Sequence, residues 1–214
     1  MPRQMPRLAD EFARQVDRAL LLAEIGERIR AASDTKQAPW SELRPSRLEA
    51  FYELAFLRVF IGWEAFLEES FVRYLCGWVA TSHSPALVVP AFATIDAARF
   101  SILGGHGFVT WADPNRVAAR CRQYILAGDN FETVIRSNQS RLAWFASIRH
   151  RIAHGSVHAR LEFGHATMGF CGRRYPGASA GRFLRDWNLW AGSAERWLQT
   201  LGSELKNLAF QIVP

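Results

Sequence analysis

Residues 46–75 read SRLEAFYELAFLRVFIGWEAFLEESFVRYL, and apolar side chains return in this stretch at every third or fourth position. An α-helix has about 3.6 residues per turn, so this spacing gathers the apolar side chains on one helical face. A capping box, Ser46-Arg47-Leu48-Glu49, directly follows Pro45 and predicts the first turn. We therefore expect one long helix that ends near Trp78 and whose apolar face includes Phe51, Ala55, Val59, Trp63, Phe66 and Phe71.

The helical period continues on both sides of this stretch. Upstream, it predicts a first helix whose apolar residues are Leu8, Phe12, Val16, Leu20, Ile25 and Ile29. Downstream, Asp113-Pro114, Asp129 and Ser140 are typical helix starts, and a final helix is expected at about residues 186–210. The sequence thus predicts an all-α fold: one helical domain over residues 1–214, with a long second helix and irregular connecting loops.

Three segments are expected to interrupt the helices. Ser84-Pro85 predicts a short helical restart, with Ser84 as the cap and Pro85 in the first turn. Residues 157–168 are compatible with a short extended segment. Residues 164–181 are rich in glycine and carry Arg173 and Arg174, which predicts a long basic loop.

The charge balance favours a polyanionic partner. The chain has 26 Lys and Arg against 20 Asp and Glu, a net charge of +6, and its only lysines are Lys36 and Lys206. Arginine binds phosphate through two parallel hydrogen bonds and stacks on bases, so this composition leans toward a polyanionic partner. The alternative is that the charge serves only solubility.

The cysteines and the apolar segments exclude several other classes of protein. Cys76, Cys121 and Cys171 are odd in number and far apart, which argues against a disulfide framework or a thiolate zinc site. Residues 1–12 lack the apolar core of a signal peptide. The apolar run at residues 54–63 is interrupted by Arg58, so we expect no membrane span and a reducing, cytoplasmic location.

The segment Ser147-Ile148-Arg149-His150-Arg151-Ile152-Ala153-His154-Gly155 concentrates the chemistry-bearing side chains. Arg149 and His154 are five residues apart, which on a helix separates them by about 140°. They therefore flank a cleft, an arrangement that suits a site completed by a second copy of the helix. RNA cleavage needs a base for the ribose 2′-OH and a fixed cation for the phosphate, roles that histidine and arginine fill. No acidic cluster for Mg²⁺ is evident, so we expect no metal and no cofactor.

This segment resembles the R-x4-6-H signature of the HEPN superfamily, which is often written R-N-x-x-A-H-G. Residues 52–75 look like an earlier HEPN helix, through the run Trp63-Glu64-Ala65-Phe66-Leu67. Residues 111–125, WADPNRVAARCRQYI, resemble the tryptophan-led helix that precedes the motif in the RiboL-PSP-type HEPN branch. The resemblance covers about residues 46–160, and the final helix is compatible with it.

The resemblance implies an all-α bundle, a homodimer across the motif helices and metal-independent RNA cleavage that leaves a cyclic phosphate. It implies Arg149 and His154 as catalytic residues, and a role as a toxin or anti-phage effector with an antitoxin or another defence protein as partner. The chain departs from the family at His150, where Asn or Asp is commoner, which puts the supporting geometry in doubt. HEPN proteins without activity exist, so the runner-up function is a non-catalytic RNA-binding or protein-interaction module.

Each of these residues also has a simpler interpretation. Arg149 can be a solvated helix residue, and His154 can cap a helix C-terminus, where positive charge is favoured. Glu64 either pairs with an arginine of the motif helix as a supporting residue or only faces a groove.

Other side chains leave further alternatives open. His150, His154 and His158 are each four residues apart, a stripe that could ligate a metal in a metal-binding helical protein, with Glu162 as the nearby carboxylate. Arg151, Arg173 and Arg174 are candidate RNA contacts or solvated charges. His106 is either a phosphate contact or a turn residue. The stripe of Trp187, Trp190 and Trp197 is expected in the core rather than as a base-stacking surface.

Overall fold

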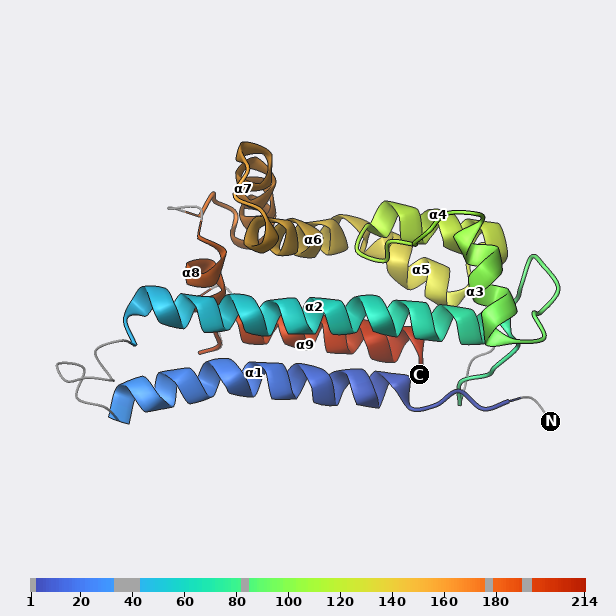
Figure 1. Ribbon diagram of the computed structural model, residues 1–214, viewed down its shortest axis with the longest axis horizontal. Coiled ribbons are helices and arrows are strands. Elements are labelled where there is room, and N and C mark those ends of the chain that lie inside the picture. Colours follow the sequence, from blue (N-terminus) through green and yellow to red (C-terminus); the bar gives the residue numbers. More distant parts are fainter. Residues whose placement is uncertain (1–2, 33–42, 82–84, 176–178, 190–193) are drawn as a thin grey trace. The chain divides into compact units, whose positions relative to one another are not determined.

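The computed structural model describes residues 3–32, 43–81, 85–175, 179–189 and 194–214 (Figure 1). Within these ranges the chain forms α-helices and isolated β-bridges but no strand, so the predicted all-α fold is confirmed. The helices are α1 (Leu8–Ala32), α2 (Pro45–Leu75), α3 (Ile95–Leu103), α4 (Pro114–Tyr124), α5 (Asn130–Ser137), α6 (Gln139–Ala153), α7 (Val157–Cys171), α8 (Ala180–Arg185) and α9 (Trp197–Ile212).

The predicted long helix is confirmed as α2, and most of its apolar face is buried. Phe51 is the exception, with 40% of its surface exposed. The helix begins at Pro45, where the carbonyl of Arg44 accepts from the Leu48 N–H at 3.1 Å. Glu49 does not serve the predicted capping box but accepts a hydrogen bond from the Ser179 hydroxyl at 3.0 Å.

The chain divides into two compact units, each assembled from segments that are distant in sequence. Unit 1 comprises Met1–Ala13, Trp63–Ala143 and Lys206–Pro214, and unit 2 comprises Arg14–Gly62 and Trp144–Leu205. Helices α1, α2, α6 and α9 contribute residues to both units. Within unit 2, α9 packs closely against α1, because a Cβ added at Gly202 would lie 3.0 Å from Val16 and 3.5 Å from Leu20.

Unit 1 has an aromatic core around Phe71. Its ring makes edge contacts with Trp111, Tyr124 and Phe131, at centroid distances of 5.5, 6.1 and 5.4 Å. The short helices around it carry side-chain caps, because backbone N–H groups at a helix start have no partner within the helix. Asp113 and Asp129 cap α4 and α5, as the sequence predicted.

The predicted helical restart at Pro85 is wrong. No helix includes residues 85–94; the next helix, α3, begins at Ile95 because the Thr94 side chain accepts a hydrogen bond from the Ala97 N–H. Ser84, the expected cap, lies outside the described residues.

Residues 157–171 form helix α7, so both the extended segment at 157–168 and the early start of the loop at 164–181 were wrong predictions. The Ser156 side chain caps α7 by accepting from the Ala159 N–H, and Gly172 ends it with a φ of 68°. Gly169 is not a turn residue: a Cβ there would lie 2.3 Å from the Trp144 ring of α6. This glycine therefore reflects close helix packing.

The final helix starts about ten residues later than predicted, at Trp197. Before it, the chain doubles back, because the Asp186 carbonyl accepts from the Trp197 N–H at 2.9 Å and the Asn188 N–H donates to Glu195 at 2.7 Å. Trp187 consequently lies outside any helix and is 51% exposed, whereas Trp197 is buried in the core as predicted. Trp190 lies outside the described residues.

Gly181 allows α8 to pack against α2, and its replacement provides a test of this packing. A Cβ at Gly181 would lie 2.4 Å from the backbone oxygen of Glu49, which cannot move aside as a flexible side chain would. We expect Gly181→Ala to lower the free energy of unfolding by about 1–3 kcal/mol, the usual cost of overpacking, as measured by chemical denaturation. Gly107→Ala is the control, since nothing lies within 4 Å of its added Cβ; equal midpoints for both variants would contradict the packing.

Candidate nucleic-acid site at the end of α6

The sequence motif lies at the C-terminal end of α6, in unit 2. Arg149, His150 and Arg151 are half-buried in the last turns of the helix, and His154 follows its last residue and is exposed. The His154 N–H still donates to the His150 carbonyl at 2.9 Å, so the helical hydrogen-bond pattern extends to it. α6 itself starts at Gln139, one residue before the predicted cap Ser140.

Three histidines and one glutamate meet where α6 gives way to α7. Glu162 of α7 lies 2.6 Å from His150 Nδ1 and 3.1 Å from His158 Nε2. The His150 ring contacts the His154 ring edge-on, with centroids 4.8 Å apart, and the His158 ring at 6.0 Å. The short link between the helices therefore brings together side chains from two different helices.

Arg149 and Arg151 differ in their surroundings. The Arg151 guanidinium donates to the His154 carbonyl at 3.1 Å, which holds the end of α6. The Arg149 guanidinium, in contrast, has no acidic or hydrogen-bonding partner among the described residues. A half-buried cation without a counter-charge has a strong preference for an anion, and arginine is suited to phosphate.

The metal-site alternative finds no support in the arrangement of side chains. Across the described ranges, no group of three or more His, Cys, Asp or Glu residues is placed to hold a metal ion. His150 and His158 instead direct one ring nitrogen each at the Glu162 carboxylate.

The remaining predicted site residues belong to other segments of the chain. Glu64 belongs to unit 1 and the motif to unit 2, so its predicted pairing with a motif arginine stays a prediction. Arg173 and Arg174 are exposed just after α7. His106 is an exposed residue of the turn after α3, where its N–H donates to Leu103.

Arg173 also lines a hollow of unit 2 with a volume of about 270 Å³. Its other lining residues include the exposed Trp187 and Asp186, whose pKa is raised by burial. The sequence did not indicate this hollow, because it depends on the chain reversal between α8 and α9.

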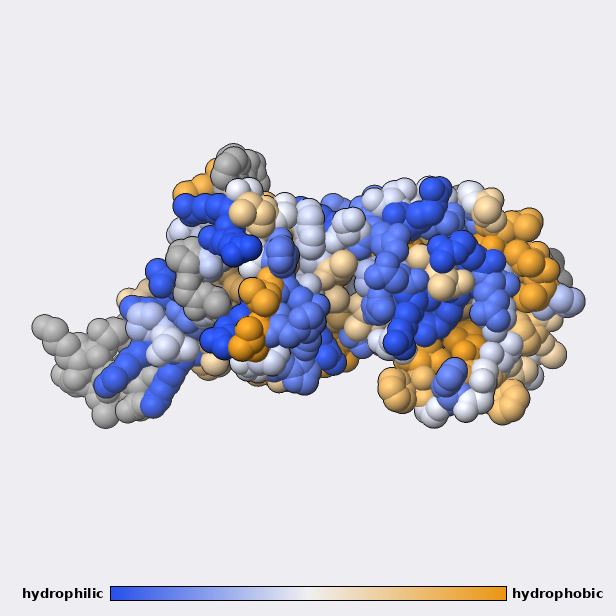
Figure 2. Space-filling model, turned by 90° about the horizontal axis from the view of Figure 1, so that it is seen from above, coloured by the Kyte–Doolittle hydropathy of each residue, from blue (hydrophilic) through white to orange (hydrophobic). Residues whose placement is uncertain are grey.

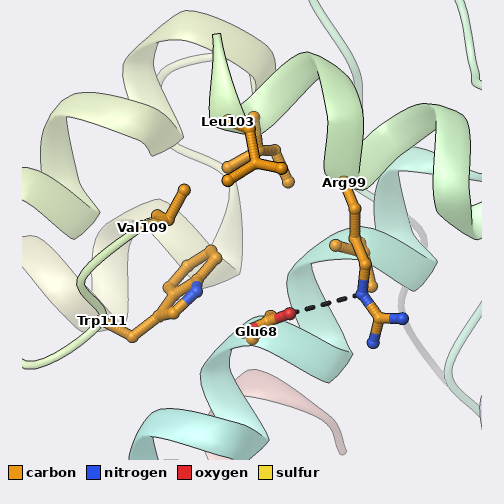
Figure 3. A pocket seen from close by; sticks show the side chains of 7 residues that line it. Glu68, Arg99, Leu103, Val109 and Trp111 are labelled. Carbon is orange, nitrogen blue, oxygen red and sulfur yellow. Dashed lines mark ion pairs between the residues drawn. The ribbon is translucent and has the colours of Figure 1, made fainter. Parts of the chain in front are cut away.

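Unit 1 contains a smaller apolar cavity of about 110 Å³ (Figure 3). Val109, Trp111 and Leu103 line it, and an ion pair of 3.3 Å between Arg99 and Glu68 lies at its edge. Ligand pockets usually measure about 300–1,000 Å³, and no histidine lines this one, so we assign no chemistry to it. Exposed apolar residues occur nearby in sequence, at Phe100 and Phe108, and Figure 2 shows hydrophobic surface at the end that carries α3.

From the sequence, Glu162 was expected only as the carboxylate near a possible metal site, and its contact with His150 was not predicted. His158 and Glu162 are four residues apart, a spacing that places two side chains on the same face of a helix. The spacing is visible in the sequence, but it predicts a shared face only if residues 157–171 are helical, as the structure shows.

Comparison of the chain with protein-family models, with curated proteins and with solved structures found no significant match in any of the three. Among the described residues, no helix combines the length and the apolar character needed to cross a bilayer.

Proposed function

We propose that this protein is a metal-independent endoribonuclease of the HEPN type, acting in the cytoplasm as a toxin or anti-phage effector. The observation that carries the proposal is the end of α6, where the half-buried Arg149 and the exposed His154 lie five residues apart beside two further histidines. The sequence resemblance to HEPN proteins and the all-α fold support it.

In this mechanism, His154 removes the proton from a ribose 2′-OH. The freed oxygen forms a bond to the adjacent phosphorus, and the bond from phosphorus to the 5′-oxygen breaks. The leaving 5′-oxygen takes up a proton, so the products are a 2′,3′-cyclic phosphate and a 5′-hydroxyl end. Arg149 binds the phosphate and stabilises the charge that develops on it, which is the role of a fixed guanidinium.

The second candidate is a non-catalytic module of the same type that binds RNA or a partner protein such as an antitoxin. The observation that favours it is the engagement of His150 by Glu162, which is also compatible with a purely structural role for this histidine. The two candidates differ in one outcome: the second binds RNA without cutting it.

Cleavage of RNA in the presence of EDTA tests the proposal. We expect Arg149→Ala and His154→Ala each to lower the cleavage rate by about 10²–10⁴-fold, the usual contribution of such groups. Arg18→Ala and His165→Ala are matched controls, because both side chains are exposed on helices of unit 2 and neither belongs to the motif segment. A folded wild-type protein that cuts none of a broad panel of RNAs would contradict the proposal, as would activity that disappears with the chelator.

RNA affinity should fall steeply as salt rises, because binding releases counterions from the phosphates. We expect the double variant Arg173→Ala/Arg174→Ala to reduce the slope of log K against log salt by about 0.7 for each phosphate that it no longer neutralises. The variant Arg14→Ala/Arg18→Ala removes the same charge from α1 and should leave the slope nearly unchanged. Fluorescence anisotropy with a non-cleavable RNA measures both; an affinity independent of salt would exclude electrostatic binding.

We also propose that the active form is a twofold homodimer in which the ends of two α6 helices line one cleft. Arg149 and His154 diverge by about 140° at the end of α6, so one copy does not easily direct both side chains at one phosphate. Two copies related by a twofold axis can bring the four side chains together around it. Repulsion among the basic residues should weaken the dimer at low pH unless RNA is bound. Analytical ultracentrifugation tests this, and a strict monomer at tens of micromolar, with and without non-cleavable RNA, rules it out.

A further inference from the structure

The Glu162 carboxylate determines which nitrogen of His150 holds its proton. A carboxylate only accepts hydrogen bonds, so His150 Nδ1, which lies 2.6 Å from a carboxylate oxygen, is the donor. The partner of one ring nitrogen fixes the state of the other. His150 therefore keeps its proton on Nδ1, and Nε2 is the nitrogen that gains or loses a proton.

We propose that Glu162 is a positioning residue that makes His150 the general acid of this site, opposite His154 as the general base. This inference rests on the proposed ribonuclease function and extends it. The ring centroids of the two histidines are 4.8 Å apart, so both imidazoles can reach oxygens of one phosphate.

Acting together, His154 and His150 balance the protons of the reaction. His154 gains the proton of the 2′-OH as the bond from the 2′-oxygen to phosphorus forms. As the bond from phosphorus to the 5′-oxygen breaks, His150 gives its Nε2 proton to that oxygen, which leaves as a hydroxyl. His150 ends neutral with its Nδ1 proton still donated to Glu162, and exchange with water restores both histidines.

The position of Glu162 fits this role. Its side chain is 36% exposed and that of His150 is 34% exposed, so the pair is partly shielded while the ring can still meet a substrate. Glu162 comes from α7, whose approach to α6 is fixed by the contact between Gly169 and Trp144.

A substrate with a better leaving group distinguishes a general acid from a structural histidine. An RNA in which sulfur replaces the bridging 5′-oxygen at the cut site releases a thiolate, which needs no proton from the enzyme. With ordinary RNA we expect His150→Asn to lower the single-turnover rate by about 10²–10⁴-fold. With the sulfur substrate the same variant should approach the wild-type rate, whereas His154→Ala should stay slow on both.

Variants of Glu162 and His158 test the positioning role. Glu162→Ala should behave like His150→Asn: slow on ordinary RNA and near the wild-type rate on the sulfur substrate. Glu162→Gln can still accept a hydrogen bond from Nδ1, so its rate on ordinary RNA should fall less. His158→Asn is the matched control, because it removes the other contact of the Glu162 carboxylate. Its cleavage rate should stay close to that of the wild type on both substrates.

Nitrogen-15 NMR of the imidazoles gives a readout that does not depend on activity. We expect a proton on His150 Nδ1 in the wild-type protein and a shift toward the Nε2–H tautomer in Glu162→Ala. A wild-type protein with the proton on Nε2 alone, or an equal loss for His150→Asn on both substrates, would overturn the inference. If cleavage then still requires Arg149 and His154, the ribonuclease proposal stands and only the role of Glu162 and His150 is overturned. If the protein does not cleave RNA at all, both proposals are overturned.

Discussion

The close approach of α7 to α6 determines where every charged group of the candidate site lies. It depends on Gly169, where even one methyl group would collide with the Trp144 ring. Phe170, the next residue, packs edge-on against Trp144 and Phe145, with centroid distances of 5.3 and 5.6 Å. Because interiors are packed as densely as organic crystals, this contact fixes the relation between the two helices, and with it the distance from Glu162 to His150.

The sequence predicted the parts of the fold whose signals are local. The period of α2 and the caps Asp113 and Asp129 depend only on neighbouring residues, and the structure bears them out. The start of α9 and the whole of α7 could not be predicted in this way. A glycine that ends a helix and a glycine that admits a tryptophan ring look alike in sequence, and only the tertiary contact of Gly169 tells them apart. The grouping of His150, His158 and Glu162 depends on that same contact.

The net positive charge is only partly available to a polyanion, because several arginines serve the fold. In unit 2, Glu27 accepts from Arg185 Nε at 2.6 Å and lies 3.6 Å from Arg196. Burial acts to raise the pKa of Glu27, but the hydrogen bond and charge of Arg185 outweigh it, and the pKa falls below its ordinary value. In unit 1, Arg73 and Arg99 both pair with Glu69. The number of arginines in the sequence is therefore larger than the number available to bind an anion. An anion site must be inferred from individual side chains.

Arg149 is the side chain that favours such an anion site most strongly. Glu162 is the nearby carboxylate of the motif region, and its two oxygens are already occupied by His150 and His158 rather than by a guanidinium. Carboxylates and guanidiniums commonly form ion pairs in proteins, but Glu162 makes none with an arginine among the described residues. Folded proteins tend to depart from such local rules at functional sites. Glu162 contacts two imidazoles instead, and this arrangement agrees with the proposal that Arg149 binds an external phosphate.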